Sequence, residues 1–416
     1  MTDKPRFSLS KNISKFILLG LSWLVLKKHK PLVIGITGSL GKTTATKFIA
    51  TLLAKEFKVI ETEYEFATTL TAPLTILRFK KPKRTKRIFW LLPFFFIKAL
   101  GLLFLKKEYP RCFVLELRSD VRTGKSMASL IKFIQPRVGI ITTIQPVHLT
   151  YFKNINRIVR AKRALIESLP QDGLALLNYD DPLVRKMAKF SQAPVLFYGL
   201  SPKADIRAKE IKLGPTGLEF KILYQDKLIP TKAPHLINQA SIYSILAASG
   251  LALVYTHLSS QQIAQAIAQL KPIKGRGNPV PGIKKTILIN DAFNATPRSV
   301  LSALDSLVAV FKERRKIAVL GDMLQMEQLT KKGHQEVGRK VAQIKPELLI
   351  TVGPNAQIIA REAIKLGYPT ERVFETADFK EAISLLKLRI KEGEAILFKG
   401  SHGMKLYKIV EELQAK

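Results

Sequence analysis

Short apolar segments alternate with stretches of helical periodicity along most of the chain. From residue 31 onward the segments PLVIGIT, KVIETE, CFVLEL, RVGIITTI and LALLN have the length of strands, and helical patterns separate them. Strands that are joined through helices are typical of a mostly parallel sheet covered by helices. The pattern therefore predicts an α/β protein.

A second series of strands and helices follows a loop-like stretch, KPIKGRGNPVPG, at about residues 270–281. Its strands are TILIND, RKIAVLGD, ELLITVG, RVFET and EAILFKG. We expect a central domain over residues 31–273 and a Rossmann-like α/β domain over residues 274–416. A small β excursion is predicted at residues 203–226.

Length and composition agree with this division. The 416 residues exceed what one hydrophobic core usually serves, and 47% of them are hydrophobic. Glycine and proline contents are ordinary, which excludes a collagenous or wholly disordered chain. The single cysteine, Cys112, excludes an internal disulfide and fits a reducing compartment, so the cytosol is expected.

The net charge of +36 changes the picture, because it far exceeds what solubility requires. Such an excess predicts anionic partners, whether nucleic acid, phospholipid or phosphorylated substrates. The first 110 residues hold 21 Lys and Arg against 6 Asp and Glu. Part of the excess positive charge therefore flanks, in the sequence, the most apolar part of the chain.

Two apolar runs lie in that region, at residues 16–26 and 88–105. The first is shorter than the ~20 residues that cross a bilayer and has no signal-peptidase site, and the second contains Pro93 and Lys98. We interpret residues 1–30 as a basic amphipathic segment and residues 85–107 as an apolar insertion, both lying on an anionic membrane surface. Packing on the protein, a partner chain and a true span are the alternatives. Nucleic acid is disfavoured, because the basic runs adjoin aliphatic blocks rather than a stacking platform.

The strongest chemical motif is GITGSLGKTT at residues 35–44, between a predicted strand and a predicted helix. Glycines allow backbone N–H groups to approach phosphate oxygens at a helix N-terminus, Lys42 would neutralise the phosphates, and Thr43 would ligate Mg²⁺. The spacing from Gly35 differs by one residue from the general GxxxxGK(S/T) pattern. An ordinary strand-to-helix turn does not account for its three glycines and two threonines together. The predicted nucleotide-binding residues are Gly38, Ser39, Gly41, Lys42, Thr43 and Thr44.

Three further residues are unremarkable singly. Glu116 ends a predicted strand, where a carboxylate can hold Mg²⁺ but is more commonly just solvated. His148 follows another strand and Lys162 lies on the next helix, where a capping histidine and a surface lysine are the simplest interpretations.

Their order along the chain resembles the central ATPase domain of the Mur ligase superfamily. The segments NDAFNATPRSVLSAL, AVLGDMLQMEQLTKKGHQEVG and ILFKGSHGMKLYKIV are similar to motifs of its D-alanyl-D-alanine-adding branch, which acts in peptidoglycan synthesis. The resemblance covers about residues 31–416. It implies a P-loop ATPase central domain and a reaction in which ATP phosphorylates a carboxylate and an amine then displaces phosphate to form an amide.

The resemblance also implies roles for residues. Thr43 and Glu116 would hold one Mg²⁺, while His148 and a carbamylated Lys162 would hold a second. Arg276 would reach the γ-phosphate of ATP. Asp291 and Asn294 would contact the ribose and the adenine.

Several segments depart from the family pattern. About 30 residues precede Gly35, so an N-terminal UDP-binding domain is not expected, which leaves open whether a partner protein supplies it. Residues 64–72 and 117–125 differ from the expected substrate loops, and His402 stands where an arginine is expected. The reaction class is therefore more secure than the substrate.

We expect an acidic cell-wall precursor and D-alanyl-D-alanine or a similar amine as substrates, with the enzyme in the cytoplasm on the inner membrane face. One alternative is another superfamily activity, like that of folylpolyglutamate synthases or of enzymes that amidate lipid-linked precursors. Another is a non-catalytic, membrane-bound nucleotide-binding scaffold. The presence of His148 and Lys162 argues against the scaffold, because nucleotide binding alone does not require a second metal.

Overall fold

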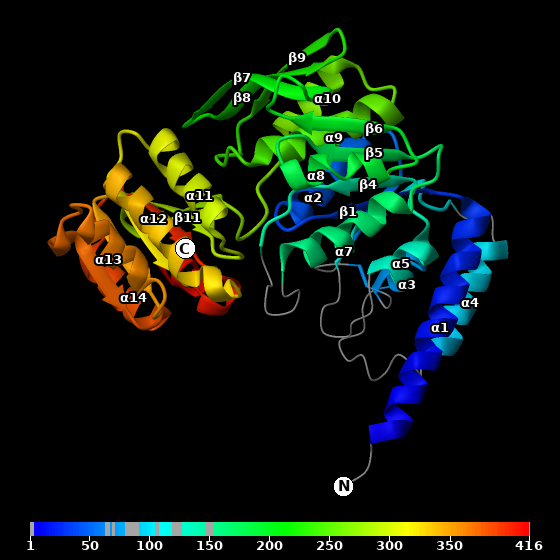
Figure 1. The fold of residues 1–416 in the computed structure, drawn as a ribbon, viewed down its shortest axis with the longest axis horizontal. Helices are drawn as coiled ribbons and strands as arrows, with labels where there is room; N and C mark the ends of the chain where they lie inside the picture. The colour runs from blue at the N-terminus through cyan, green and yellow to red at the C-terminus, as the bar shows by residue number, and fades with distance from the viewer. Residues whose placement is uncertain are drawn as a thin grey trace.

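The computed structural model describes residues 4–62, 67–68, 71–79, 91–104, 108–118, 127–146 and 154–415, with side chains from residue 16 onward. Figure 1 shows two lobes, each built around a β-sheet. A pair of helices, α1 (Lys4–His29) and α4 (Leu92–Phe104), lies along the outer edge of the larger lobe.

The larger lobe contains a sheet with the strand order β2-β3-β1-β4-β5-β6-β7-β8-β9. Neighbouring strands are parallel from β2 to β7, and β8 and β9 continue the sheet in antiparallel fashion. This arrangement confirms the predicted mostly parallel α/β sheet. The β excursion was predicted too short, because β9 belongs to it and all three of its strands extend the main sheet. The strands are β1 (Leu32–Thr37), β2 (Val59–Glu61), β3 (Cys112–Glu116), β4 (Val138–Ile141), β5 (Leu174–Asn178), β6 (Val195–Gly199), β7 (Ile206–Gly214), β8 (Gly217–Tyr224) and β9 (Lys227–Ala233).

Helices cover both faces of this sheet, which explains why its central strands are continuously apolar. On β1, Ile34 and Ile36 pack into the core formed with α2 (Lys42–Leu53), α9 (Ser241–Tyr255) and α10 (Ser260–Ala268). Val33 points to the opposite face. That face is covered by α3 (Thr71–Ile76), α5 (Met127–Ile134), α7 (Ile155–Glu167) and α8 (Pro182–Arg185).

The two apolar runs of the sequence form the helices α1 and α4. One stripe of each helix packs into the core of the larger lobe, including Leu18, Val25 and Phe95. His29 at the end of α1 stacks on Tyr109, with 4.2 Å between ring centroids, and its Nε2 lies 2.9 Å from the Leu102 carbonyl on α4. No helix in the described part of the chain is both long and apolar enough to cross a bilayer.

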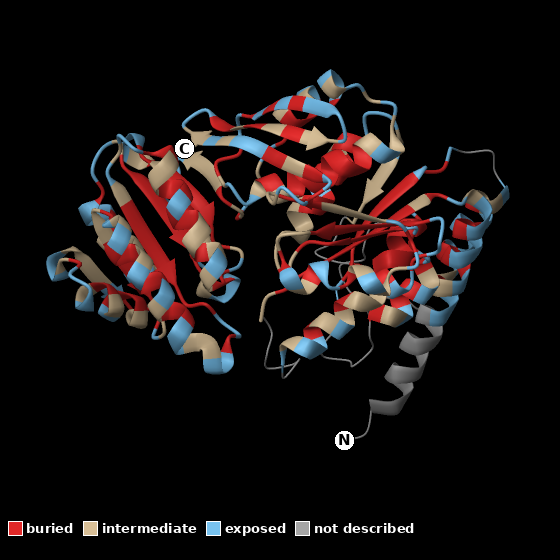
Figure 2. Ribbon diagram, turned by 45° about the horizontal axis from the view of Figure 1, so that its top comes forward, coloured by how far each residue is buried: buried red, intermediate tan, exposed pale blue. Residues whose placement is uncertain are grey.

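The smaller lobe contains a second sheet with the order β10-β11-β15-β12-β13-β14, parallel except for β10. Helices again cover both faces, so its four inner strands are mostly buried (Figure 2). The strands are β10 (Asn278–Pro281), β11 (Ile287–Asp291), β12 (Lys316–Gly321), β13 (Leu348–Val352), β14 (Val373–Thr376) and β15 (Ala395–Lys399). One face carries α11 (Pro297–Val310), α12 (Thr330–Ile344) and α13 (Gln357–Lys365), and the other carries α14 (Phe379–Arg389) and α15 (Tyr407–Leu413).

Candidate active site

The loop between β1 and α2 turns tightly against the end of β4. Gly38 has φ 152°, and a Cβ atom there would lie only 1.9 Å from the Thr142 hydroxyl. The backbone N–H of Ser39 donates to the Thr143 carbonyl at 2.7 Å, and the Thr142 hydroxyl donates to the Leu40 carbonyl at 2.6 Å. Only glycine fits at position 38, because both the left-handed backbone and the neighbouring strand exclude a side chain.

The same loop ends in the N-terminus of α2. Gly41 caps this helix in a left-handed conformation, and Lys42 is its first residue. The first N–H groups of a helix have no intrahelical partner and carry a partial positive charge. The turn that holds Lys42, Thr43 and Thr44 is therefore suited to bind phosphate.

Lys42 is desolvated in this turn. Its ammonium group lies 3.4 Å from the Ser39 carbonyl. The pKa of Lys42 is lowered to about 8: desolvation is the main cause, Glu116 opposes the shift, and the charges of Arg276 and Arg118 add to it. A lysine in this state gains from a bound anion, because the anion restores the interactions that burial removed.

Lys162 lies directly beneath the loop. It belongs to α7, is 8% exposed, and its Nζ donates to the Gly38 carbonyl at 2.8 Å. Burial lowers the pKa of Lys162 well below its usual value, and the charges of Lys42 and Arg118 act in the same direction. The surface-lysine interpretation is wrong, and this amine is poised to be neutral.

Glu116 is the last residue of β3, and its backbone pairs with Ile36 on β1, one residue before that strand ends. It is 6% exposed, and its charge acts on both Lys42 and Lys162. Among the described groups that act on these lysines, cations outnumber this one carboxylate. The site therefore favours added negative charge, as a polyphosphate would provide.

Arg276 joins the smaller lobe to this loop. It lies between α10 and β10, and its guanidinium donates to the Thr43 hydroxyl at 2.9 Å. The same guanidinium lies over the Phe293 ring, 4.4 Å from its centroid. A cation carried by the segment between the lobes is thus placed at the first turn of α2.

A cleft of about 460 Å³ opens between the two lobes beside this contact. This volume lies within the ~300–1,000 Å³ typical of small-molecule sites, and its place at the carboxyl ends of strands is where α/β sheets bind ligands. Asp291 and Asn294 line it from the smaller lobe. The walls also include Gly41, Thr44, Thr142, Asn178, Asn238, Tyr243, Arg276, Arg298, Ser302 and Lys399.

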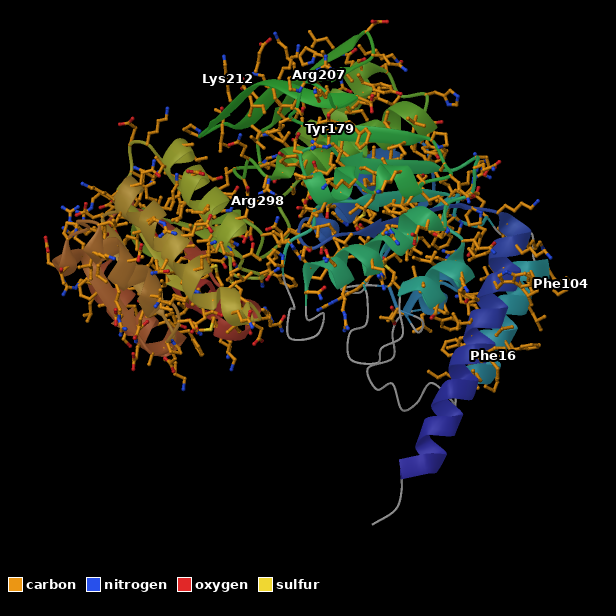
Figure 3. The ribbon with its side chains drawn as sticks, in the orientation of Figure 1. Phe16, Phe104, Tyr179, Arg207, Lys212 and Arg298 are labelled. Carbon is orange, nitrogen blue, oxygen red and sulfur yellow. The ribbon has the colours of Figure 1, made fainter. Side chains whose placement is uncertain are left out.

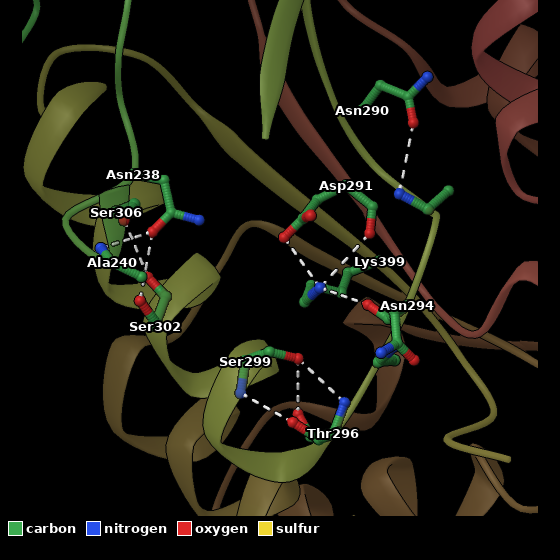
Figure 4. A network of polar contacts seen from close by, with 12 residues as sticks. Asn238, Ala240, Asn290, Asp291, Asn294, Thr296, Ser299, Ser302, Ser306 and Lys399 are labelled. Atoms are coloured by element: carbon green, nitrogen blue, oxygen red, sulfur yellow. Dashed lines mark hydrogen bonds and ion pairs between the residues drawn. The ribbon is translucent and has the colours of Figure 1, made fainter. Parts of the chain in front are cut away.

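Asp291 is held by a buried ion pair. Lys399 Nζ lies 2.9 Å from its carboxylate and donates to the Asn294 carbonyl at 2.8 Å (Figure 4). Burial raises the pKa of Asp291, while Lys399 works against that shift. Lys399 therefore fixes the two residues that were predicted to contact the ribose and the adenine.

Sequence reasoning missed Lys399, and on the larger lobe it missed Thr142 and Asn178, which hold the loop through hydrogen bonds. Lys399 ends β15 in the segment ILFKGSHG, where a strand-end lysine was an available signal. Thr142 follows β4, and its carbonyl accepts from the Asn178 side chain at 2.8 Å. The pair of threonines after that strand was the corresponding signal.

The remaining predicted positions have mixed outcomes. His148 lies outside the described residues, as do most of residues 64–72 and residues 119–125. His402 stacks on Tyr407, with 5.1 Å between ring centroids. The structure brings Lys42, Lys162 and Glu116 into one electrostatic cluster.

The donor set near the loop suits Mg²⁺ of a nucleotide. This ion usually takes one or two protein carboxylates and completes its shell with phosphates and water. Glu116 and the Thr43 hydroxyl fit that requirement. No group of three His, Cys, Asp or Glu side chains that could enclose a metal occurs in the described residues.

Two family models match the chain. The Mur ligase middle domain matches residues 98–252, and the Mur ligase glutamate ligase domain matches residues 275–402. The chain belongs to the Mur ligase family. The first match includes Glu116 and Lys162 of this Mur ligase, and the second includes Arg276, Asp291 and Lys399.

Several relatives align with more than nine-tenths of this Mur ligase. A UDP-N-acetylmuramoyl-tripeptide–D-alanyl-D-alanine ligase of Bacillus subtilis is 27% identical over 92% of the chain and 75% of its own length. MurF ligase from Thermotoga maritima in complex with ADP has a TM-score of 0.75 at 21% identity, covering 95% and 82% of the two chains. MurF from Acinetobacter baumannii has a TM-score of 0.76 at 21% identity, covering 96% and 80%. The structural likenesses support the two-lobed α/β fold.

Proposed function

We propose that this Mur ligase uses ATP to join D-alanyl-D-alanine, or a similar amine, to the carboxylate of a UDP-muramoyl-tripeptide precursor. The contact between Arg276 and Thr43 carries the proposal, because it brings a cation of the smaller lobe onto the phosphate-binding turn. The Bacillus subtilis relative is named as a ligase of D-alanyl-D-alanine and a UDP-N-acetylmuramoyl-tripeptide, and it aligns over 92% of the chain.

The loop and the first turn of α2 bind the phosphates of ATP. Backbone N–H groups of residues 38–44 donate to phosphate oxygens, and Lys42 supplies positive charge. Arg276 contacts the phosphoryl group that moves to the substrate. Asp291, held by Lys399, and Asn294 contact the ribose and the adenine.

Thr43 and Glu116 would hold one Mg²⁺, and His148 and the carbamate of Lys162 would hold a second. When bound, these ions would supply positive charge to the transferring phosphoryl group and to the substrate carboxylate that attacks it. The charge of Glu116 also stabilises the Lys42 ammonium against the nearby positive charges of Arg276 and Arg118.

Lys162 becomes carbamylated in this proposal. A neutral amine attacks CO₂, forms an N–C bond and releases one proton, which leaves a carboxylate in place of an ammonium. The lowered pKa of Lys162 supplies the neutral amine, and the cations around it stabilise the new negative charge. After incubation with ¹³C-bicarbonate, a carbamate carbon resonance should be present in the wild type and absent in Lys162→Ala.

The substrate carboxylate then attacks the γ-phosphoryl group of ATP, so that ADP leaves and an acyl phosphate forms. The amine attacks the acyl carbon, and inorganic phosphate leaves as the amide forms. Lys42 and the α2 N-terminus stabilise the charge that builds on the phosphate oxygens. We place this reaction in the cytoplasm at the inner membrane face, and a partner protein that supplies a substrate-binding domain is compatible with it.

The direct experiment incubates the protein with ATP, Mg²⁺, the UDP-muramoyl-tripeptide and D-alanyl-D-alanine, and measures product mass. We expect ADP, phosphate and the pentapeptide product in equal amounts. Folate with glutamate, and lipid-linked acids with ammonia, test the other superfamily activities in parallel. ATP binding without turnover on any of these pairs would favour the scaffold and contradict the proposal.

A further inference from the structure

Large exposed hydrophobic residues are concentrated on the helix pair α1 and α4. Of fourteen such residues in the described chain, nine lie on these two helices, and the other five are scattered over the rest of the molecule. Phe16 and Phe104 are 79% and 78% exposed. We call the nine residues the α1–α4 surface: Phe16, Ile17, Trp23, Leu24, Phe94, Phe96, Ile97, Leu100 and Phe104.

This surface is distinct from the stripe that packs on the protein. On α1 the buried positions 18, 21, 22, 25 and 26 follow helical spacing and face the core. On α4 the buried positions are Phe95, Ala99 and Leu102. Packing on the larger lobe therefore accounts for one face of each helix and leaves a second apolar face uncovered, to which the labelled Phe16 and Phe104 of Figure 3 belong. Contiguous exposed apolar surface of this kind is rare outside interaction sites.

Cations border the surface, and no carboxylate lies on either helix. The apolar run of α1 has four Lys and Arg before it and Lys27 and Lys28 after it. Lys27 Nζ lies 5.0 Å from the Trp23 ring centroid, and Lys28 Nζ lies 5.9 Å from that of Phe104 on α4. These lysines extend along aromatic rings with their charges exposed, as snorkelling lysines do.

We propose that the α1–α4 surface binds the headgroup region of an anionic phospholipid bilayer, with the two helices lying in the interface. A leaflet presents negative phosphates above apolar chains, which complements cations that flank an apolar face. The α4 helix has 13 residues, or roughly 20 Å at 1.5 Å per residue, so it is too short to span the bilayer. The binding is independent of the ligase reaction, because the surface shares no residue with the cleft.

The test measures sedimentation of the full chain with vesicles of phosphatidylcholine, with or without phosphatidylglycerol, at low and high salt. The wild type should bind the anionic vesicles, and salt should weaken this binding by screening. The triple variant Phe94→Ser, Phe96→Ser, Phe104→Ser should bind at least about tenfold more weakly, because it removes inserted apolar area. Lys27→Gln and Lys28→Gln should each cost about fivefold on anionic vesicles.

Leu388→Ser is the matched control, because Leu388 is a single exposed apolar residue, 82% exposed, on α14 of the other lobe. It should bind vesicles as the wild type does. Phe95 is left unchanged, because it is buried and its loss would disturb the fold.

The proposal is overturned if the wild type does not bind anionic vesicles at low salt, or if the triple variant binds them as tightly as the wild type does. It is also overturned if the same three phenylalanines instead hold two copies together in solution without lipid. ATP hydrolysis measured on the same samples separates the two proposals. Vesicle binding without any ligase activity would support the surface and contradict the proposed reaction.

Discussion

The active-site loop and the α1–α4 surface are both rich in positive charge, but they hold it differently. At the loop, Lys162 is buried and Lys42 is half-buried, and desolvation lowers the pKa of both. On the helix pair, Lys27 and Lys28 are exposed beside aromatic rings. The first arrangement suits an anion of defined shape, such as a nucleotide phosphate. The second suits the anionic headgroups of a lipid bilayer.

This difference shows why net charge alone does not identify a partner. A buried cation gains most from a ligand that replaces lost solvation with fixed contacts, as a nucleotide phosphate does. An exposed cation gains only a screened attraction, and needs adjacent apolar area to bind firmly. The excess of Lys and Arg is therefore arranged in two different ways in one chain, and we propose a different anionic partner for each arrangement.

The largest expected effect is the difference in stability between variants of two neighbouring phenylalanines on α4. Phe95 is 1% exposed and contacts the Phe79 ring edge-on, with 4.5 Å between centroids, whereas Phe96 is 51% exposed. Phe95→Ala should lower the free energy of unfolding by about 3–5 kcal/mol, and Phe96→Ala by less than ~0.5 kcal/mol. Urea unfolding followed by circular dichroism measures both. Equal losses of unfolding free energy in the two variants would mean that α4 does not have one buried and one exposed face.

Lys42→Ala should reduce kcat for ATP hydrolysis by about 10²–10³, because it removes a half-buried positive charge that would stabilise the transferring phosphoryl group. Lys47→Ala is the control: it changes an exposed lysine on the same helix whose partner is Glu61. Steady-state phosphate release measures both variants. The nucleotide assignment fails if the two variants hydrolyse ATP at the same rate.

Arg276→Ala should lower kcat/KM for ATP by about 10- to 100-fold, the usual cost of a lost charge-assisted hydrogen bond. Lys274→Ala tests whether any cation of this segment would serve, because Lys274 is 78% exposed and pairs with Glu411. We expect little change in that control. Similar losses in the two variants would show that the contact with Thr43 has no special role.

The pH dependence should show the smallest effect. Lys42 is protonated below its pKa of about 8 and loses its charge above it. Because kcat/KM reports the free enzyme, its value for ATP should fall about threefold between pH 7.5 and 8.5. An unchanged or rising kcat/KM across this range would contradict the proposed role of Lys42.

The sequence allowed the loop to be predicted because its signal is local. Three glycines, a lysine and two threonines between a strand and a helix specify the turn, and β1 and α2 place them as expected. The order of strands and helices likewise follows from hydrophobic periodicity.

Residues that act through distant partners could not be predicted in this way. Lys162 is buried because α7 packs beneath a loop 124 positions earlier, and helical periodicity does not reveal that contact. Lys399 reaches Asn294 from a strand 105 positions away. The faces of α4 depend on where α1 and Phe79 pack, so Phe95 could not be told apart from its neighbours.

Transfer of ¹⁸O from the acid substrate to phosphate tests the central claim most directly. The protein is incubated with ATP, D-alanyl-D-alanine and UDP-muramoyl-tripeptide labelled with ¹⁸O in its reacting carboxylate, and the released phosphate is analysed by mass spectrometry. An acyl phosphate in the cleft between the lobes predicts one ¹⁸O atom in each phosphate, and labelled phosphate should form about 10²–10³ times more slowly with Lys42→Ala. Unlabelled phosphate released at the wild-type rate would mean that ATP is hydrolysed by water, and would contradict the account.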